Sequence, residues 1–235
     1  MMDHRDNPAL LDRAENNCPM TQCIVNILNH SFTQGIIPSE WTNSILVPVE
    51  KKGDMADPSN YRGISLMPSI LKVLLMILNK RIQEYMEDNN LYSKEQAGFW
   101  TKEESTLQAA CVIDILQRRK LQGKRTYCLF VDFEKAYDQV PHGLLTELLH
   151  NYGIRGRINK YIRRLYEKST FQVRVSGGEE ALYTSICELL RGLRQGCPLS
   201  LILFNIFINN IYEWNNGNGI VKPGVMVPLT EEGPS

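Results

Sequence analysis

The segment FVDFEKAYD at Phe130–Asp138 holds the residue on which the interpretation of this sequence depends. The run Tyr127–Val131 is continuously apolar and short enough for a buried strand, and Asp132 is the first polar residue after it. A carboxylate at such a strand end is a hard oxygen ligand suited to Mg²⁺, although a strand-end aspartate can also simply cap a turn. Asp138 has two readings as well: a second metal ligand, or a hydrogen-bond acceptor in the turn before Pro141.

Composition and charge set wide limits on function. The 235 residues are 43% hydrophobic, enough for a globular core, and the 26 basic residues balance the 26 acidic ones. The overall charge therefore neither requires nor excludes a polyanionic partner. Basic residues nevertheless concentrate in residues 118–125, which contain no acid, and in residues 153–174, where Glu167 is the single acid.

Cysteine usage and the N-terminus indicate an intracellular protein, cytoplasmic or nuclear, with no membrane association. The six cysteines form no C-x-x-C pair, which argues against a zinc site. Cys111, Cys128 and Cys197 lie in apolar runs, where reduced and buried thiols are expected. The N-terminal residues lack the apolar core of a signal peptide, and no run approaches the roughly 18 apolar residues of a membrane span.

Two helices and a strand are predicted in the first ninety residues. A short helix is expected at Met20–His30, and a strand at Ser44–Val49, where Pro48 favours an edge position. After Pro68, apolar residues recur at intervals of three and four and predict a helix of four or five turns. The residues of this stripe are Leu71, Leu74, Leu75, Leu78, Ile82 and Tyr85.

The second half alternates predicted helices and strands. Thr101-x-x-Glu104 is a capping box for a helix that Gly123 ends, and Pro141 begins another helix. Phe171, Val173 and Val175 alternate with polar residues and predict a hairpin with a partner strand near Leu182–Ile186. Pro198 begins a last helix that is apolar almost all round and should be buried.

Five segments, taken in order from about residue 20 onward, resemble the reverse transcriptase of non-LTR retrotransposons. Five ordered motifs make chance agreement implausible. The segments are GIIPSEW at Gly35–Trp41, VPVEKKGD with NYRGISL at Val47–Leu66, EQAGF at Glu95–Phe99, FVDFEKAYDQVPH at Phe130–His142, and GLRQGCPLSLILFNIFIN at Gly192–Asn209.

The resemblance implies an α+β fold, a fragment of a right-hand polymerase with fingers and a partial palm, whose antiparallel sheet packs on helices, and without a thumb. We expect an N-terminal remnant without fixed structure at residues 1–19, and fingers with the early palm helices at 20–125. The palm, with the catalytic aspartate strand and the glycine-rich loop, should occupy 126–214, followed by a truncated tail at 215–235.

The resemblance also implies the metal site and its neighbourhood. Asp132 would be the catalytic carboxylate that binds two Mg²⁺ ions, helped by the backbone carbonyl of Phe133. Tyr137 matches the residue that excludes a ribose 2′-hydroxyl, and its alternative is ordinary packing in the palm. Gln195 and Gly196 match the loop that lies beside the nucleotide and template.

Phosphate and nucleic-acid contacts follow from the same resemblance. Lys51 or Lys52 and Arg62 match residues that grip the triphosphate of the incoming dNTP, with lysine as a point charge and arginine as a bidentate donor. An RNA template and a DNA primer are the implied partners. The residues expected to contact nucleic acid are Trp100, Arg155, Arg157, Lys160, Arg163 and Arg164, where the indole would stack on a base and the cations would face the phosphate backbone.

Departures from the family pattern qualify this interpretation. The aromatic-Ala-Asp-Asp motif of the family is absent, and no Asp-Asp pair occurs in the sequence. Gly63 and Leu201 stand where the family usually has proline, and Trp100 where it usually has arginine. Because Mg²⁺ usually needs more than one carboxylate, we expect a truncated copy that is inactive as this chain.

Three alternatives remain at this stage. The chain could be a non-catalytic module that binds nucleic acid through its basic residues. It could be an aspartate-nucleophile phosphatase built on Asp132, which Glu134 disfavours because that mechanism uses a second aspartate there. It could also be a translated pseudogene product that does not fold stably, with an exposed sheet edge.

Overall fold

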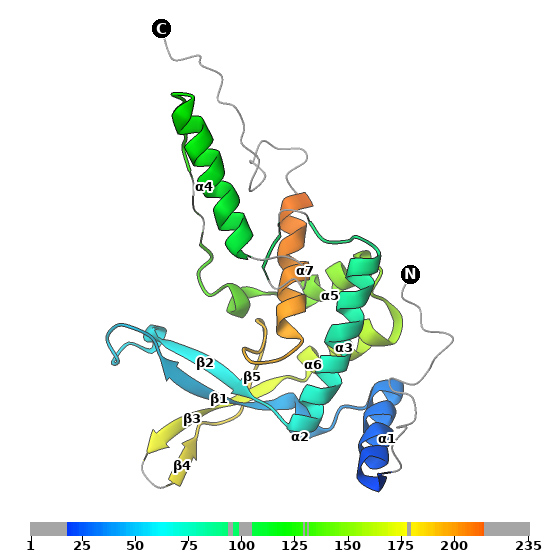
Figure 1. Ribbon diagram of the computed structural model, residues 1–235. Coiled ribbons are helices and arrows are strands. Elements are labelled where there is room, and N and C mark those ends of the chain that lie inside the picture. Colours follow the sequence, from blue (N-terminus) through cyan, green and yellow to red (C-terminus); the bar gives the residue numbers. More distant parts are fainter. Residues whose placement is uncertain are drawn as a thin grey trace.

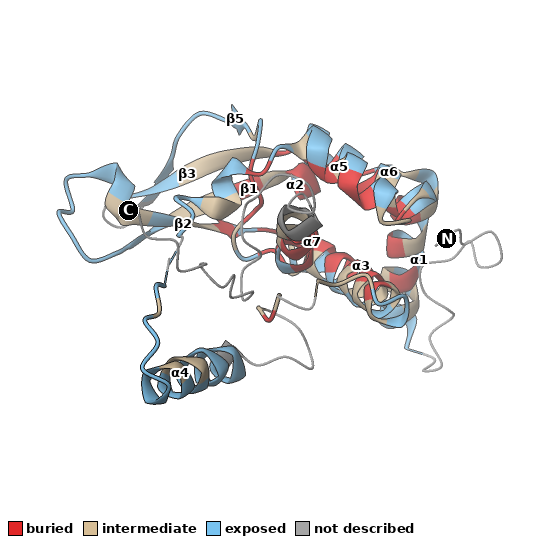
Figure 2. Ribbon diagram, turned by 90° about the horizontal axis from the view of Figure 1, so that it is seen from above, coloured by how far each residue is buried: buried red, intermediate tan, exposed pale blue. Residues whose placement is uncertain are grey.

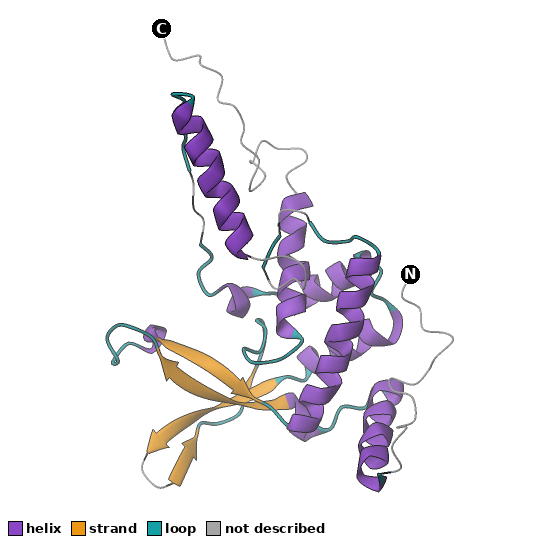
Figure 3. Cartoon of the chain, in the orientation of Figure 1, coloured by secondary structure: helices purple, strands orange, loops and turns teal. Residues whose placement is uncertain are grey.

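The computed structural model describes residues 18–93, 96–98, 105–128, 130, 132–177 and 180–213, and the statements below concern these residues. A cluster of helices packs at one end of a small twisted sheet, as Figures 1 and 3 show. This arrangement confirms the predicted α+β class. The division at residues 125 and 126 stays a prediction. Of the predicted remnant at 1–19, residues 1–17 lie outside the described residues, as does the predicted tail at 215–235, whereas Pro19 already begins a helix.

The N-terminal helix α1 (Pro19–Gln34) confirms the predicted helix and extends it by one turn. Gly35 ends it in the left-handed conformation with φ 65°, which glycine adopts without strain. The short helix α2 (Ser39–Thr42) follows and leads directly into strand β1 (Asn43–Glu50).

Five strands form the sheet, in the order β2-β1-β3-β4, with β5 also paired to β3. They are β1, β2 (Tyr61–Leu66), β3 (Thr170–Gly177), β4 (Glu180–Tyr183) and β5 (Cys187–Glu188). The pairs are antiparallel except β1 with β3, which is parallel and joins Asn43 to Thr170. The predicted hairpin is confirmed, with its second strand two residues earlier than expected. The sheet as a whole is mixed.

Pro48 explains how far β1 can be paired on both sides. Residues 43–46 of β1 pair with β3, whereas Pro48 lies in the half of the strand that pairs with β2 alone, opposite Gly63. A proline has no N–H to donate to a neighbouring strand. The edge of β1 that faces β3 is accordingly unpaired in the half of the strand that contains Pro48. The predicted edge position is therefore right at Pro48 and wrong for the first half of the strand.

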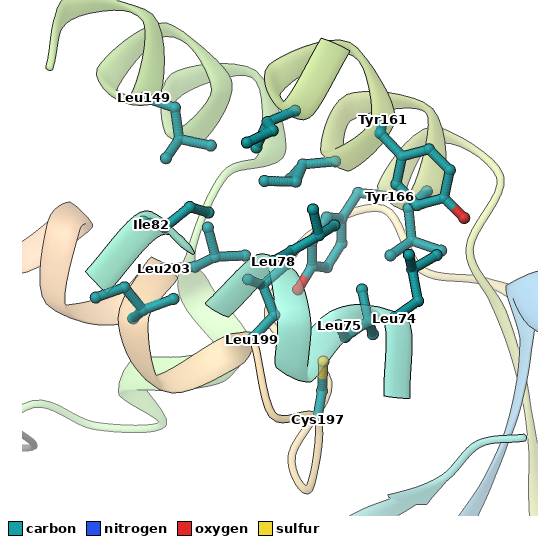
Figure 4. Close-up of a cluster of buried hydrophobic side chains, with 14 of the residues drawn as sticks. Leu74, Leu75, Leu78, Ile82, Leu149, Tyr161, Tyr166, Cys197, Leu199 and Leu203 are labelled. Atoms are coloured by element: carbon teal, nitrogen blue, oxygen red, sulfur yellow. The ribbon is translucent and has the colours of Figure 1, made fainter. Parts of the chain in front are cut away.

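The core lies among α1 and four further helices, α3 (Ser69–Asp88), α5 (His142–Asn151), α6 (Gly156–Glu167) and α7 (Ser200–Glu213). Side chains from all four meet in one cluster in Figure 4, and Figure 2 shows the buried faces turned toward one another. The predicted stripe on α3 is confirmed, since its five aliphatic residues are fully buried and Tyr85 packs against them.

The helix α4 (Ser105–Leu121) stands apart from this core in Figures 1 and 2. Its apolar residues Val112 and Ile113 are exposed. Gly123 follows it with φ 68°, as the predicted end requires, while the capping box at 101–104 lies outside the described residues.

The predicted buried strand at Tyr127–Val131 is wrong for its described residues. Tyr127, Cys128 and Phe130 belong to no strand, and Tyr127 and Phe130 are 75% and 87% exposed. No described strand pairs with them, so an apolar run alone does not make a strand here. The predicted burial of the cysteines is wrong for Cys111 and Cys128, which are exposed, and is confirmed for Cys197.

None of the helices in the described part of the chain is long and apolar enough to cross a membrane.

Substitution of Leu78 by alanine should lower the free energy of unfolding by about 2–5 kcal/mol, because it opens a cavity in the fully buried cluster. Met76→Ala on the exposed side of the same helix is the matched control and should cost less than about 0.5 kcal/mol. Urea denaturation of both variants measures the difference. A wild-type chain without a cooperative transition would instead support the unstable-product alternative.

Candidate functional site

A loop at residues 192–200 lies at the centre of the site. It connects β5 to α7 and turns twice at glycines with left-handed backbone, Gly192 (φ 89°) and Gly196 (φ 93°). Leu193, Arg194 and Cys197 are buried, whereas Gly196 is exposed and Gln195 is half-buried. The loop thus presents Gln195 and Gly196 outward while its other residues hold it in the fold.

The loop runs along the segment that contains Tyr137 and Asp138. The Gly192 N–H donates to the Val140 carbonyl and the Leu193 N–H to the Tyr137 carbonyl, each at 2.8 Å. The Gln195 amide donates to the Asp138 carboxylate at 3.2 Å. The Asp138 carboxylate therefore accepts its hydrogen bond from the loop and not from the turn before Pro141, and its reading as a second metal ligand stays a prediction.

The same loop contacts strand β2 of the NYRGISL segment. The Ser65 N–H donates to the Gln195 carbonyl at 2.8 Å, and a methyl group added at Gly196 would lie 3.6 Å from the Ile64 side chain. Since side chains two residues apart in a strand share a face, Arg62 lies on the face of β2 that carries Ile64. Arg62 is exposed there, so the guanidinium predicted to bind phosphate is on the loop side of the strand.

Lys51 and Lys52 lie farther from the loop than Arg62. Both are exposed just beyond the end of β1, where the Lys51 N–H donates to the Asn60 carbonyl at 2.7 Å. The loop contacts Ser65, which pairs with Leu46 of β1. Lys51 is five residues beyond Leu46, which at the rise of a strand is a distance of about 16 Å. Arg62 is three residues from Ser65, about 10 Å along β2, and so lies nearer the loop than the two lysines at the tip of the hairpin.

Buried asparagines on α7 hold the segment that includes EQAGF. Asn205 donates to the Gly98 carbonyl at 3.0 Å and accepts from the Gln96 amide at 3.3 Å. Asn209 donates to the Leu91 carbonyl at 3.0 Å and accepts from the Ser93 N–H at 2.7 Å. Both amides are almost fully buried within a helix predicted to be apolar all round, so their hydrogen bonds offset the cost of their burial.

His142, in the first turn of α5, is a further contact of the loop. Its Nε2 lies 2.8 Å from the Gly192 carbonyl, and its ring packs against that of Tyr166 at 4.8 Å between centroids. Burial lowers the pKa of His142, and the nearby Arg194 charge lowers it further, against the opposing effect of the Gly192 hydrogen bond. The neutral ring that donates this hydrogen bond is therefore the favoured form.

Asp132 and Phe133 are both exposed, at the start of the turn that leads to Tyr137. Asp132 and the Phe133 carbonyl offer hard oxygen donors, yet the described residues contain no group of three His, Cys, Asp or Glu that could hold a metal ion. Asp138, six residues on, is engaged by Gln195. The described donors therefore do not fit a site for two metal ions.

Tyr137 stacks on Phe204 of α7, with ring centroids 4.5 Å apart and 20° between their planes. Its hydroxyl is buried without a hydrogen-bond partner among the described residues, and burial raises its pKa. The ring position is thus fixed by packing, which is the alternative considered for it. Its predicted role against a ribose 2′-hydroxyl stays a prediction.

The basic stretch at 155–168 forms the outer face of α6. Its inner face carries Tyr166, which packs toward the loop, so the cations lie on the far side of the helical layer from Gln195. Several of them are engaged: Arg155 donates to the His150 carbonyl, Arg163 pairs with Glu167, and Arg164 donates to the Gly35 carbonyl. Arg157 and Lys160 are exposed. Trp100, the remaining residue expected to contact nucleic acid, lies outside the described residues.

The other four segments singled out in the sequence are therefore all hydrogen-bonded to residues 192–209. The GIIPSEW segment joins them through the Trp41 carbonyl, which accepts from Arg194 at 3.2 Å.

Residues 49–221 match the family "Reverse transcriptase (RNA-dependent DNA polymerase)". The match covers well over half of the chain, and the chain belongs to this family. The family in general acts on a nucleic-acid template and primer with nucleotide substrates, and it uses a divalent metal.

The relatives come from non-LTR retrotransposons. The chain is 29% identical over 187 residues to the Pol polyprotein of the type-1 retrotransposable element R2 of Popillia japonica, covering 79% of this chain and 25% of that protein. It is 24% identical over 213 residues to the RNA-directed DNA polymerase of the mobile element jockey of Drosophila melanogaster, covering 90% of this chain and 22% of that protein. A Xenopus laevis protein, the uncharacterized 149 kDa protein of transposon TX1, is 26% identical over 184 residues, which is 77% of this chain and 14% of that protein. The chain thus spans a quarter or less of the length of these relatives.

Sequence reasoning missed the polar residues that hold the site together, namely Arg194, Asn205, Asn209 and His142. Asn205 and Asn209 interrupt an otherwise apolar helix at a spacing of four residues, which places them on one face. That spacing was the available signal. Arg194 has no comparable signal, because an arginine in a loop is usually exposed.

Gly192→Ala should destabilise the chain by more than about 1 kcal/mol, because its φ of 89° is strained for alanine and the new methyl group would lie 2.9 Å from the Asp138 Cα. Gly143→Ala is the control, since it lies in α5 with no atom within 4 Å and should be neutral or stabilising. Thermal unfolding compares the two. Equal stability of both variants would contradict the close approach of the loop to Asp138.

Proposed function

We propose that this chain is the fingers and most of the palm of a retrotransposon reverse transcriptase that makes DNA on an RNA template. In the parent enzyme Arg62 contacts the triphosphate of the dNTP, and Gln195 and Gly196 lie beside the nucleotide and template. Asp132 binds Mg²⁺ there. As this chain alone, the protein does not catalyse extension.

The observation that supports this proposal is the convergence of four separate segments on residues 192–209. The backbone carbonyl of Gln195 accepts a hydrogen bond from β2, and its side-chain amide donates to Asp138. A half-buried residue whose backbone and side chain are each held by a hydrogen bond is suited to contact a ligand, because little conformational entropy remains to be lost on binding. Gly196 next to it has no side chain, so another molecule can approach its backbone closely.

The donor set supports the absence of activity. Transfer of a nucleotide by two metal ions needs carboxylates that hold both ions about 4 Å apart. The sequence has no Asp-Asp pair, and the described residues offer Asp132 without a neighbouring cluster of ligands. Because Mg²⁺ gives up its water reluctantly, Asp132 alone retains the ions poorly.

A second candidate function is nucleic-acid binding without catalysis, and the outer face of α6 favours it. Lys160 and Lys168 are exposed there beside exposed arginines. Phosphate binding by such a face is independent of base sequence and of the metal site. An intracellular location, cytoplasmic or nuclear, belongs to either function.

Primer extension tests the first proposal. With an RNA template, a DNA primer, dNTPs and Mg²⁺, the chain should give no extension above background, and Asp132→Asn should change nothing, because the ligand set is incomplete. Product length on a denaturing gel is the measurement. Robust extension that Asp132→Asn abolishes would contradict the proposed inactivity.

Filter binding of an RNA–DNA hybrid at increasing salt tests the second candidate. The double variant Lys160→Gln and Lys168→Gln should reduce the log–log salt slope by up to about 2, roughly 0.9 for each phosphate that a lysine no longer neutralises. Lys80→Gln, at an exposed lysine on α3 that pairs with Glu84, is the control and should leave the slope unchanged. An equal change in the control, or no binding at low salt, would count against a binding face on α6.

A further inference from the structure

Arg194 is a buried charge that neither the sequence patterns nor the proposed contacts with nucleotide use. Its side chain is 3% exposed, and within the described part of the chain no carboxylate lies at ion-pair distance from it. Burial lowers its pKa, opposed by the neighbouring Tyr166 and Cys197. A buried cation is costly unless hydrogen bonds compensate it, so its partners reveal its role.

The guanidinium of Arg194 joins two segments that are distant in sequence. Its Nη1 donates to the Trp41 carbonyl at 3.2 Å, and its Nη2 donates to the Thr42 carbonyl, both at the end of α2. Nη2 also donates to the Ser169 hydroxyl at 2.7 Å, directly before β3. The side chain thus bridges the starts of β1 and β3, the two strands of the parallel pair.

The backbone of Arg194 is held as firmly as its side chain. Its carbonyl accepts from the Ser200 hydroxyl at 2.8 Å and from the Cys197 N–H at 3.1 Å, which closes the turn before α7. Gln195 is the next residue, so its hydrogen bonds to Ser65 and Asp138 start one peptide unit from the fixed backbone of Arg194. A displacement of Arg194 therefore moves Gln195 relative to both Ser65 and Asp138.

We propose that Arg194 is a positioning residue, which fixes Gln195 and Gly196 against β2 and Asp138 so that they meet the nucleotide and template. This inference rests on the proposed function of the loop. Arg194 itself touches no substrate. It acts through the loop, by tying the site to the base of the sheet.

Arginine suits this position better than lysine does. The acceptors at Trp41, Thr42 and Ser169 are reached by two nitrogens of one planar, rigid fork. A lysine has one nitrogen on a flexible stem and cannot place donors at both ends of that fork. Arg194→Lys therefore keeps the charge and loses the geometry.

Hydrogen exchange of individual amides tests the inference without requiring activity. In Arg194→Ala the amide of Ser65, which donates to Gln195, should exchange at least tenfold faster relative to the Leu78 amide in the α3 core. Arg194→Lys should show an intermediate increase. Arg164→Ala is the matched control. Arg164 also donates to a carbonyl at a helix end, that of Gly35, but it has no hydrogen bond to the loop or to Ser65.

Guanidinium ion supplies a second readout, which tests whether loss of the guanidinium hydrogen bonds causes the change in Ser65 exchange. Millimolar guanidinium chloride should restore Ser65 protection in Arg194→Ala, whereas sodium chloride at the same concentration should not. If Arg194→Ala does not fold, Ser169→Ala removes one acceptor and should raise Ser65 exchange about threefold over Leu78 exchange.

Two results would overturn the inference: Ser65 protection that survives in the folded variants, or Ser65 and Leu78 exchange that rise in equal proportion. The second result would mean that Arg194 contributes only to global stability. Failure of the wild-type chain to bind an RNA–DNA hybrid would count against nucleic-acid binding by this chain, and the exchange data would still decide whether Arg194 positions the loop.

Discussion

The hydrogen bonds that leave residues 192–209 are the constraint on which the rest of this structure depends. Most of them end on backbone groups of the four other segments and so fix main-chain positions. The side chains of Asp138, His142 and Gln96 add further bonds. Backbone groups buried in a core must find partners, and here one loop and one helix supply them for turns that could not satisfy themselves. The site is consequently a property of that loop and helix, and the surrounding motifs are placed by them.

Arginines complete the ends of several helices in this chain, and this changes how its charge is read. Helix C-termini leave carbonyls without partners. Arg164 supplies a donor at the end of α1, Arg155 at the end of α5, and Arg194 at the end of α2. A run of basic residues therefore contains members that serve the fold and members that remain available to phosphate, and only the contacts separate the two.

Periodicity predicted the elements whose burial is decided locally. The stripe on α3 is correct because a helix of that length must bury its one apolar face. The run Tyr127–Val131 is apolar as well, yet a strand needs neighbours, and whether they exist is decided elsewhere in the chain. For the site, the sequence predicted the loop, Arg62 and Tyr137 through family resemblance. The arrangement of Arg194, Asn205 and Asn209 could not be predicted, because their partners are backbone carbonyls with no signature in sequence.

The parallel pairing of β1 with β3 has a consequence for biosynthesis. Asn43 and Thr170 are bonded side chain to side chain across 127 residues of chain. At roughly 5–20 residues per second, a ribosome needs about 6–25 s to make the residues between them. Through that interval the edge of β1 that pairs with β3 has no partner from its own chain and is exposed to any other strand in reach. Arrival of β3 closes that edge, and the loop that completes the site follows within some twenty residues, so the nascent chain is most vulnerable to mispairing just before its site can form.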